Sequence, residues 1–132
     1  MGDQSSTSES RTFVTLKPSD RTSTASLGLG LDAGGTQTRW ALADQQGRIV
    51  AEGHVAALHP AQAGHAIGKV AWQQGLQQLV EQLRATGCDW PVAVHAGLTG
   101  YGGQDSDIKP LLEDALRLPS ARITLSLSLI HI

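Results

Sequence analysis

This chain has little of what would place it in several large classes of protein. It has one cysteine, Cys88, among 132 residues, so an internal disulfide framework is excluded. Ten Lys and Arg against twelve Asp and Glu leave a net charge of −2, which argues against a basic face that follows nucleic-acid phosphates. No apolar run approaches the roughly 18–20 residues that cross a bilayer, and no secretory signal is recognisable. We therefore expect a soluble, cytoplasmic protein with neither a nucleic acid nor a membrane as partner.

Aromatic residues are also scarce, with three Trp, one Tyr and one Phe. The core must therefore be built mainly from Leu, Val, Ile and Ala. The length allows one domain, since domains usually have about 100–200 residues. Residues 1–26 contain twelve Ser or Thr and few large apolar side chains. Such a segment buries too little surface to offset its ordering entropy, so we predict a disordered polar tail over 1–26.

An alternating pattern begins at Leu27. Residues 27–32 alternate large and small side chains, as in a buried strand whose glycine face something approaches closely. Residues 33–38 predict a tight turn, 39–43 a second strand, 44–48 a turn in which Gly47 suits a positive φ, and 49–55 a third strand. Three consecutive strands indicate an antiparallel meander.

Helical spacing follows the meander. Apolar residues recur at helical intervals over 67–83, and Gly87 is suited to end the helix. Gly68 and Gly75 each cost roughly 1 kcal/mol within it, so close packing has to compensate. Residues 90–98 predict a strand buried on both faces and parallel to the first, and 99–103 a flexible loop.

A second helix carries apolar residues over 108–116. Ser106 or Asp107 is expected to cap it, with Pro110 tolerated in its first turn. A fifth strand begins at residues 122–125. The order βββαβαβ is that of an α/β, ribonuclease-H-like lobe.

The turn after the first strand carries the chemistry. Asp32 stands at the strand end and is followed by Gly34, Gly35 and the hydroxyl of Thr36. A carboxylate there can hold a hydrated divalent cation, and glycine N–H groups can face phosphate oxygens without interference from a Cβ. These are the parts that phosphoryl transfer requires.

Residues 29–38, followed by 41–44 and by Gly47 and Arg48, resemble the opening of the BadF/BadG/BcrA/BcrD-type ATPase family. This branch of the actin, Hsp70 and sugar-kinase superfamily includes N-acetylglucosamine kinase and bacterial glucosamine kinase. Residues 94–100 are similar to the strand and glycine turn that the family places next in its first lobe. The resemblance covers 27 to about 125 and implies that the lobe is an incomplete part of an actin-like ATPase fold.

The resemblance implies a role for each matching residue. Asp32 would bind the Mg²⁺–water cluster, and four residues of the turn would contact the β- and γ-phosphates of ATP: Gly34, Gly35, Thr36 and Thr38. Gly97 and Gly100 would let the loop approach an acceptor sugar, with Thr99 as a hydroxyl contact.

Other interpretations of the same residues are open. The Asp32 turn could be a simple hairpin, and Thr99 an ordinary exposed loop residue. Residues 28–33 also fit the loose dinucleotide fingerprint, which should end a strand and open a helix. The five histidines show no metal-ligand spacing with Cys88, and Cys88 lacks the electropositive setting of an activated thiol.

The C-terminal residues depart from the family. In the resembled family, the strand that corresponds to residues 122–125 is followed by a pair of residues ending in aspartate, which serves as the general base for the acceptor hydroxyl. This chain has Ser126, Leu127 and Ser128 at that place, so no catalytic residue is assigned. Residues 127–132 are also the direct translation of CTGTCTCTTATACACATC, which resembles a transposon-based sequencing adapter. We expect 126–132 to be a non-native tail, 27–125 a partial N-terminal kinase lobe, and the chain an N-terminal fragment. A genuine alternating strand is the alternative.

The functional expectation is ATP-dependent phosphorylation of an amino sugar, N-acetylglucosamine or glucosamine, by a longer parent protein with ATP and Mg²⁺. The fragment alone is expected to be inactive, and the parent could be a homodimer. One alternative is an ATPase that activates a dehydratase or reductase, although such activators carry cluster-ligating cysteines. The other is a non-enzymatic regulator that binds nucleotide or sugar.

Overall fold

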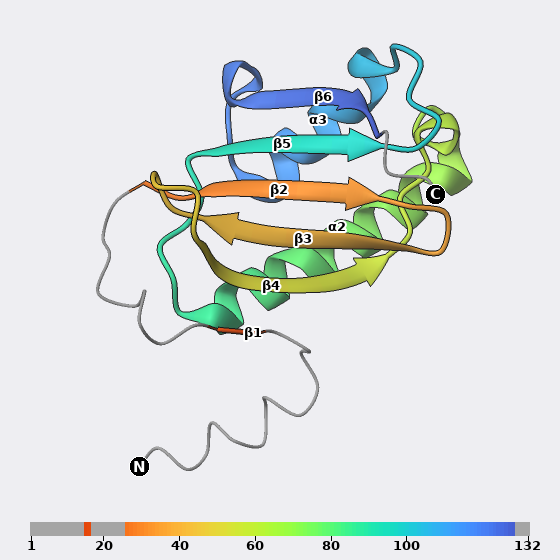
Figure 1. Cartoon of the computed structure of the whole chain (residues 1–132). Coiled ribbons are helices and arrows are strands. Elements are labelled where there is room, and N and C mark those ends of the chain that lie inside the picture. Colours follow the sequence, from red (N-terminus) through yellow and green to blue (C-terminus); the bar gives the residue numbers. More distant parts are fainter. Residues whose placement is uncertain (1–14, 17–25, 129–132) are drawn as a thin grey trace.

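The computed structural model describes residues 15–16 and 26–128. Its elements are β1 Thr15–Leu16, β2 Gly28–Ala33, β3 Gln37–Ala43, β4 Ile49–Ala56, the 3₁₀ turn η2 Pro60–Gln62, α2 Ala66–Thr86, β5 Ala93–Leu98, α3 Asp105–Leu116, the 3₁₀ turn η3 Ser120–Arg122 and β6 Ile123–Leu127. The strands form one sheet in the order β1-β4-β3-β2-β5-β6 (Figure 1).

The pairing of the strands confirms the predicted meander and crossovers. β2, β3 and β4 pair antiparallel, and β5 lies parallel to β2 with α2 in the crossover. β6 then continues the parallel half of the sheet beside β5. The mixed α/β fold expected from the sequence is therefore present from β2 to β6. β1 lies within the segment predicted to be a disordered polar tail, and it pairs antiparallel with β4. The other residues of 1–25 lie outside the described residues.

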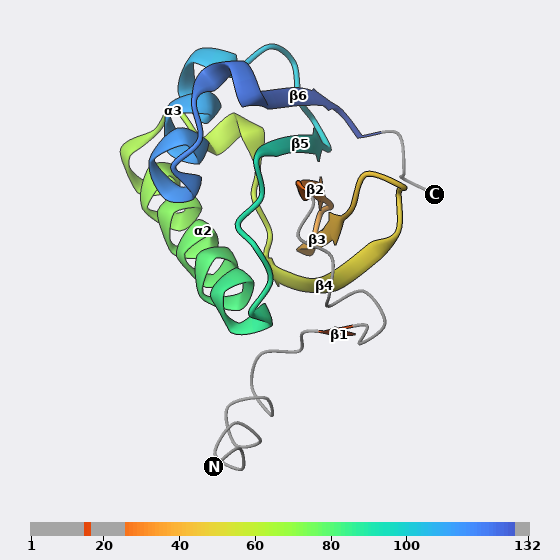
Figure 2. The same cartoon turned by 90° about the vertical axis from the view of Figure 1, so that its left-hand side faces the viewer.

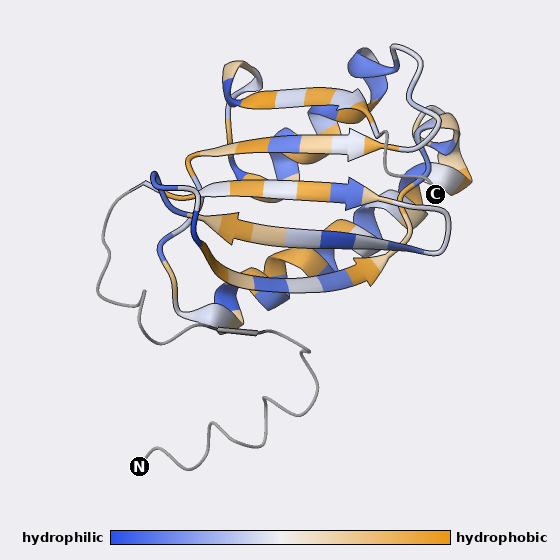
Figure 3. Ribbon diagram, viewed as in Figure 1, coloured by the Kyte–Doolittle hydropathy of each residue, from blue (hydrophilic) through white to orange (hydrophobic). Residues whose placement is uncertain are grey.

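Both long helices cover the same face of the sheet (Figure 2). The hydrophobic core lies between the helices and the sheet. The strands contribute the large side chains of their alternating patterns, such as Leu29 and Leu31 of β2 and Val94 and Leu98 of β5. Figure 3 shows the alternation of hydrophobic and hydrophilic residues along the strands.

The opposite face of the sheet carries small and polar side chains. Gly30 and His95 are exposed there, and Gly97 is half-buried. The prediction that β5 is buried on both faces is therefore wrong for the described part of the chain. Ala and Gly suit a close-packed face and an open one equally well, so the sequence pattern did not distinguish the two.

The two glycines inside α2 are at close contacts, as expected. A Cβ on Gly68 would lie 2.0 Å from the carbonyl oxygen of Gln62, and one on Gly75 would lie 2.9 Å from Cδ2 of Leu58. The helix ends at Gly87, whose φ of 73° is in the left-handed region. These contacts allow η2 and the segment after β4 to lie directly against α2.

The start of α3 differs from the prediction. The helix begins at Asp105 with Gln104 as its N-cap, so Ser106 and Asp107 lie in its first turn and do not cap it. Pro110 is the sixth residue of the helix and lies inside it. The helix can begin earlier than predicted because the acidic side chain of Asp105 is favourable in the first turn.

Three indole N–H groups join different parts of the fold. The Nε1 atom of Trp40 in β3 donates to Oε1 of Gln82 in α2 at 2.7 Å. Trp72 donates to the His59 carbonyl at 2.8 Å, and Trp90 donates to the Leu116 carbonyl at 2.7 Å. Each tryptophan therefore both fills the core and fixes a helix to a neighbouring segment.

Candidate functional site

The carboxyl ends of β2, β5 and β6 meet at one edge of the sheet, because the three strands are parallel. Asp32 is in register with Gly97, and Gly97 with Ser126. Two backbone hydrogen bonds continue the pairing beyond the strands: Thr99 N–H donates to the Ala33 carbonyl and Ser128 N–H to the Leu98 carbonyl, both at 3.1 Å. The two motifs singled out in the sequence therefore lie side by side.

Asp32 is half-buried at this edge. Its Oδ1 atom accepts a hydrogen bond from the hydroxyl of Ser128 at 2.9 Å. Among the described residues, no group of three His, Cys, Asp or Glu side chains is placed to hold a metal ion. A single carboxylate is nonetheless suited to Mg²⁺, which usually keeps several of its waters and takes one or two protein carboxylates together with phosphate oxygens.

The turn between β2 and β3 leaves its backbone accessible. Gly34 N–H donates to the Gln37 carbonyl at 3.0 Å and closes the turn. Gly35 is exposed, a Cβ on it would meet no atom within 4 Å, and its φ is not among the positive values. Neither packing nor backbone conformation therefore requires glycine at Gly35. A turn without a Cβ at this position leaves room for close approach of a phosphate.

Thr38 is placed away from this edge. It pairs with Ala33 in the hairpin, so its side chain is on the helix-covered face, opposite to that of Asp32. The residue is 0% exposed, and its Oγ1 atom has no hydrogen-bond partner. A phosphate contact through this hydroxyl is not available in this arrangement, and we leave Thr38 out of the site. Thr36 is exposed in the turn itself.

The loop after β5 approaches the same edge. A Cβ on Gly97 would lie 3.7 Å from the Leu31 carbonyl oxygen and 3.8 Å from Ser128, which are ordinary van der Waals distances. Gly100 has a φ of 84°, and the turn is closed by Tyr101 N–H donating to the Leu98 carbonyl at 3.2 Å. Thr99 is exposed.

Tyr101 fixes the far end of this loop to α3. Its hydroxyl donates a hydrogen bond to the carboxylate of Asp105. That hydrogen bond, together with a smaller effect of burial, raises the pKa of the Tyr101 phenol above its usual value. The phenol is therefore protonated at neutral pH and acts as a donor.

Arg39 is a residue of this edge that the sequence reasoning missed. It pairs with Asp32 in the β2–β3 register, so both side chains are on the face without helices, and Arg39 is exposed. A guanidinium beside the turn adds a positive charge where phosphate is expected. Counting outward from the turn would have found it, since opposite residues of a hairpin share a face.

The structure also decides between two interpretations of the glycines. A dinucleotide fingerprint requires the strand to be followed by a helix whose N-terminus receives the phosphates. Here the turn leads into β3. The turn therefore does not fit the dinucleotide fingerprint.

Comparison with solved structures assigns the lobe to a class: the chain has a sugar-kinase-like α/β fold. Among the matching structures is a protein of Chromobacterium violaceum provisionally described as an N-acetylglucosamine kinase. The identity is 25% and the TM-score 0.53, over 80% of this chain and 36% of that protein. The chain thus spans about a third of the neighbour's length. No protein-family model matches the sequence, and no curated protein does.

In the described part of the chain, no helix is both long enough and apolar enough to cross a membrane.

Proposed function

We propose that this chain forms the phosphate-binding part of an ATP-dependent kinase that phosphorylates an amino sugar, N-acetylglucosamine or glucosamine. The observation that carries the proposal is the pairing of Asp32 with an exposed turn in which Gly35 is required by nothing in the chain itself. The likeness of the lobe to a protein described as an N-acetylglucosamine kinase supports the sugar class. The resemblance of the turn to the BadF/BadG type supports the ATPase superfamily.

Each residue of the proposed site would have a role that follows from its chemistry. N–H groups of Gly34, Gly35 and Thr36 would donate to oxygens of the β- and γ-phosphates. Asp32 would orient the cation's water shell, and Arg39 would add positive charge at the open face. A bound Mg²⁺ would neutralise charge on the phosphates. Positioning and charge neutralisation are the main demands of phosphoryl transfer.

The acceptor would lie against the loop that follows β5. Gly97 and Gly100 would let this loop approach the sugar, and Thr99, which is exposed, would offer it a hydroxyl. The position at which the resembled family has its general base is occupied here by Ser126, Leu127 and Ser128. A serine hydroxyl is too weak a base to take the proton of a sugar hydroxyl. We therefore expect this chain to bind nucleotide without measurable transfer.

Cys88 bears on the choice between a kinase and an ATPase that activates a reductase. It is half-buried and packs against the core, and its N–H donates to the Thr86 hydroxyl at 3.0 Å. A half-buried thiol that packs against the core is less suited than an exposed one to bind an iron–sulfur cluster shared between two subunits. The kinase is accordingly preferred for this chain.

The proposal is tested by titrating Mg²⁺–ATP into the chain and following backbone amide shifts by NMR. Gly35→Ala should weaken binding by at least about tenfold, because its methyl group would occupy the space in which a phosphate oxygen approaches. Gly28→Ala is the matched control, since a Cβ there also meets nothing within 4 Å but lies at the other end of β2.

Equal affinity of Gly35→Ala and Gly28→Ala for the nucleotide would reject the site. Asp32→Asn should reduce the dependence of binding on Mg²⁺ without unfolding the chain. In a longer protein that contains this lobe, hydrolysis of ATP with no phosphorylation of any amino sugar would keep the site and reject the kinase.

A further inference from the structure

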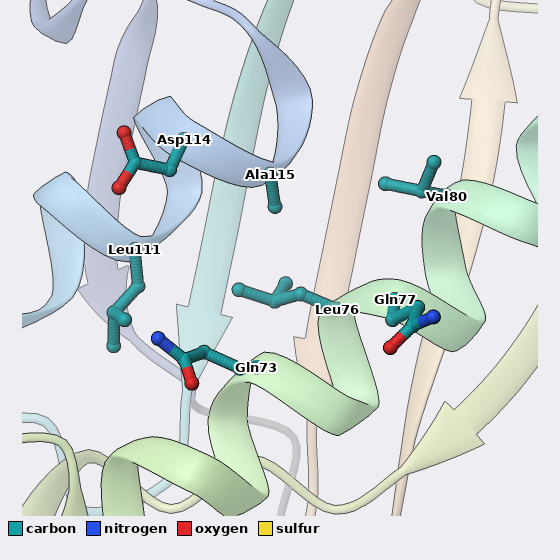
Figure 4. A pocket seen from close by; sticks show the side chains of 7 residues that line it. All are labelled: Gln73, Leu76, Gln77, Val80, Leu111, Asp114 and Ala115. Atoms are coloured by element: carbon teal, nitrogen blue, oxygen red, sulfur yellow. The ribbon is translucent and has the colours of Figure 1, made fainter.

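A shallow groove lies between α2 and α3 on the outer side of the helical layer, remote from the Asp32 edge. Its volume is about 290 Å³, and it is lined by Leu76 and Val80 of α2 and Leu111 and Ala115 of α3. Gln73, Gln77 and Asp114 form its rim (Figure 4). Beside it, Val70 is 50% exposed on α2. An apolar groove and an exposed apolar side chain thus share one helix face.

The order of residues along this face is symmetric. Outward from Gly75, Gln73 is matched by Gln77, and Val70 by Val80, while Lys69 is matched by Glu81. At 3.6 residues per turn these six side chains fall within about a third of the helix circumference, on the side away from the sheet. Lys69, Val70, Gln73, Gln77 and Glu81 are exposed, and Val80 is half-buried. No charged residue lies between Lys69 and Glu81.

We propose that α2 pairs antiparallel with α2 of a second copy of this chain, about a two-fold axis that crosses the exposed face of α2 at the level of Gly75. A two-fold axis exchanges matched positions, so a surface that binds itself must be symmetric in apolar character and opposite in charge. The α2 face meets both conditions. Val70 of each copy enters the groove at Val80 of the other, and the glutamine amides pair across the axis.

Charge decides the direction of pairing. In the antiparallel arrangement each Lys69 faces Glu81 of the other copy and lies near its Asp114, at both ends of the contact. A parallel arrangement would bring Lys69 against Lys69 and Glu81 against Glu81. Like charges placed opposite one another disfavour association, so the face selects the two-fold pair. The interface leaves the edge with Asp32 open, and the inference does not depend on the proposed nucleotide site.

The test uses the 132-residue chain in sedimentation equilibrium over a range of micromolar concentrations. The unmodified chain should show a monomer–dimer equilibrium. Lys69→Glu and Glu81→Lys should each weaken the dimer by at least about tenfold, because each creates two like-charge contacts. The double variant Lys69→Glu/Glu81→Lys should restore the original dissociation constant. A chain that is monomeric throughout, or a double variant no tighter than the single variants, would overturn the proposal.

A second pair of variants tests the apolar part. Val70→Glu should abolish the dimer, and Val92→Glu, at a 41% exposed valine that is not on α2, should leave it unchanged. Circular dichroism identifies any variant that fails to fold, and the exposed charge reversals remain informative in that case. If Val92→Glu dissociates the dimer and Val70→Glu does not, association uses another face and the proposal is wrong.

Discussion

At the scale of single residues, glycines decide how closely parts of this chain approach one another. Gly68 is held by contact, because its α-carbon faces a backbone carbonyl of η2. Gly47 is held by conformation, with a φ of 81° in the β3–β4 turn. Gly35 is held by neither. Gly28 and Gly102 share this lack of restraint, so the role of Gly35 rests on its place in the turn beside Asp32 and on the proposed nucleotide site.

Replacing the α2 glycines measures these contacts. Alanine favours a helix over glycine by about 1 kcal/mol, but at Gly68 it would meet the immovable Gln62 oxygen at 2.0 Å. We expect Gly68→Ala to lower the free energy of unfolding by about 1–3 kcal/mol. Gly75→Ala, which meets the flexible end of Leu58 at 2.9 Å, should cost less.

Urea unfolding of both variants at one protein concentration gives the comparison. A Gly68→Ala variant as stable as Gly75→Ala would show that η2 moves away freely and that its contact with α2 is loose.

At the scale of elements, the β3–β4 hairpin depends on a buried carboxylate. Oδ1 of Asp44 accepts hydrogen bonds from the N–H groups of Gln46 and Arg48, each at 2.9 Å. Oδ2 accepts one from Nε of Arg48 at 3.0 Å. The backbone hydrogen bond from Arg48 is the largest cause that lowers the pKa of Asp44, and burial opposes it in part.

This pKa predicts a pH dependence of stability. Because the folded-state pKa is below the unfolded one, Asp44 contributes stability above about pH 4, and the contribution is lost as the pH falls through the folded-state pKa. Asp44→Asn should therefore lower the Tm at pH 7 and approach the Tm of the unmodified chain in acid. A difference in Tm that stays constant from pH 7 to pH 3 would contradict this, and differential scanning calorimetry measures it.

The strands and α2 could be predicted from the sequence because their side-chain periods are unambiguous. Leu27 to Leu31 alternate strictly, and Gly47 and Gly87 mark turns that only a left-handed residue suits. The start of α3 could not be placed because Gln104, Asp105, Ser106 and Asp107 are all acceptable near a helix N-terminus. At the site, Asp32 and Gly35 followed from local pattern. The separation of Thr38 from them followed only from the pairing of β2 with β3.

At the scale of the whole molecule, topology brings together what the sequence separates. Asp32 and Ser128 are 96 positions apart and share a hydrogen bond because β2 and β6 both run parallel to β5. The two proposed interfaces, for nucleotide at the strand ends and for a second copy along α2, lie on different sides of this arrangement and can be altered separately.

The fluorescence of the three tryptophans can report on the contacts between the helices and the rest of the fold. Trp40 and Trp72 are 2% and 1% exposed, and their indole N–H groups join α2 to β3 and to the segment before η2. The indole N–H of Trp90 joins the segment before β5 to the end of α3. Emission from the folded chain should therefore be blue-shifted and should move to longer wavelength on unfolding. In variants that keep a single tryptophan, fluorescence would report separately whether loosening begins at α2 or at α3.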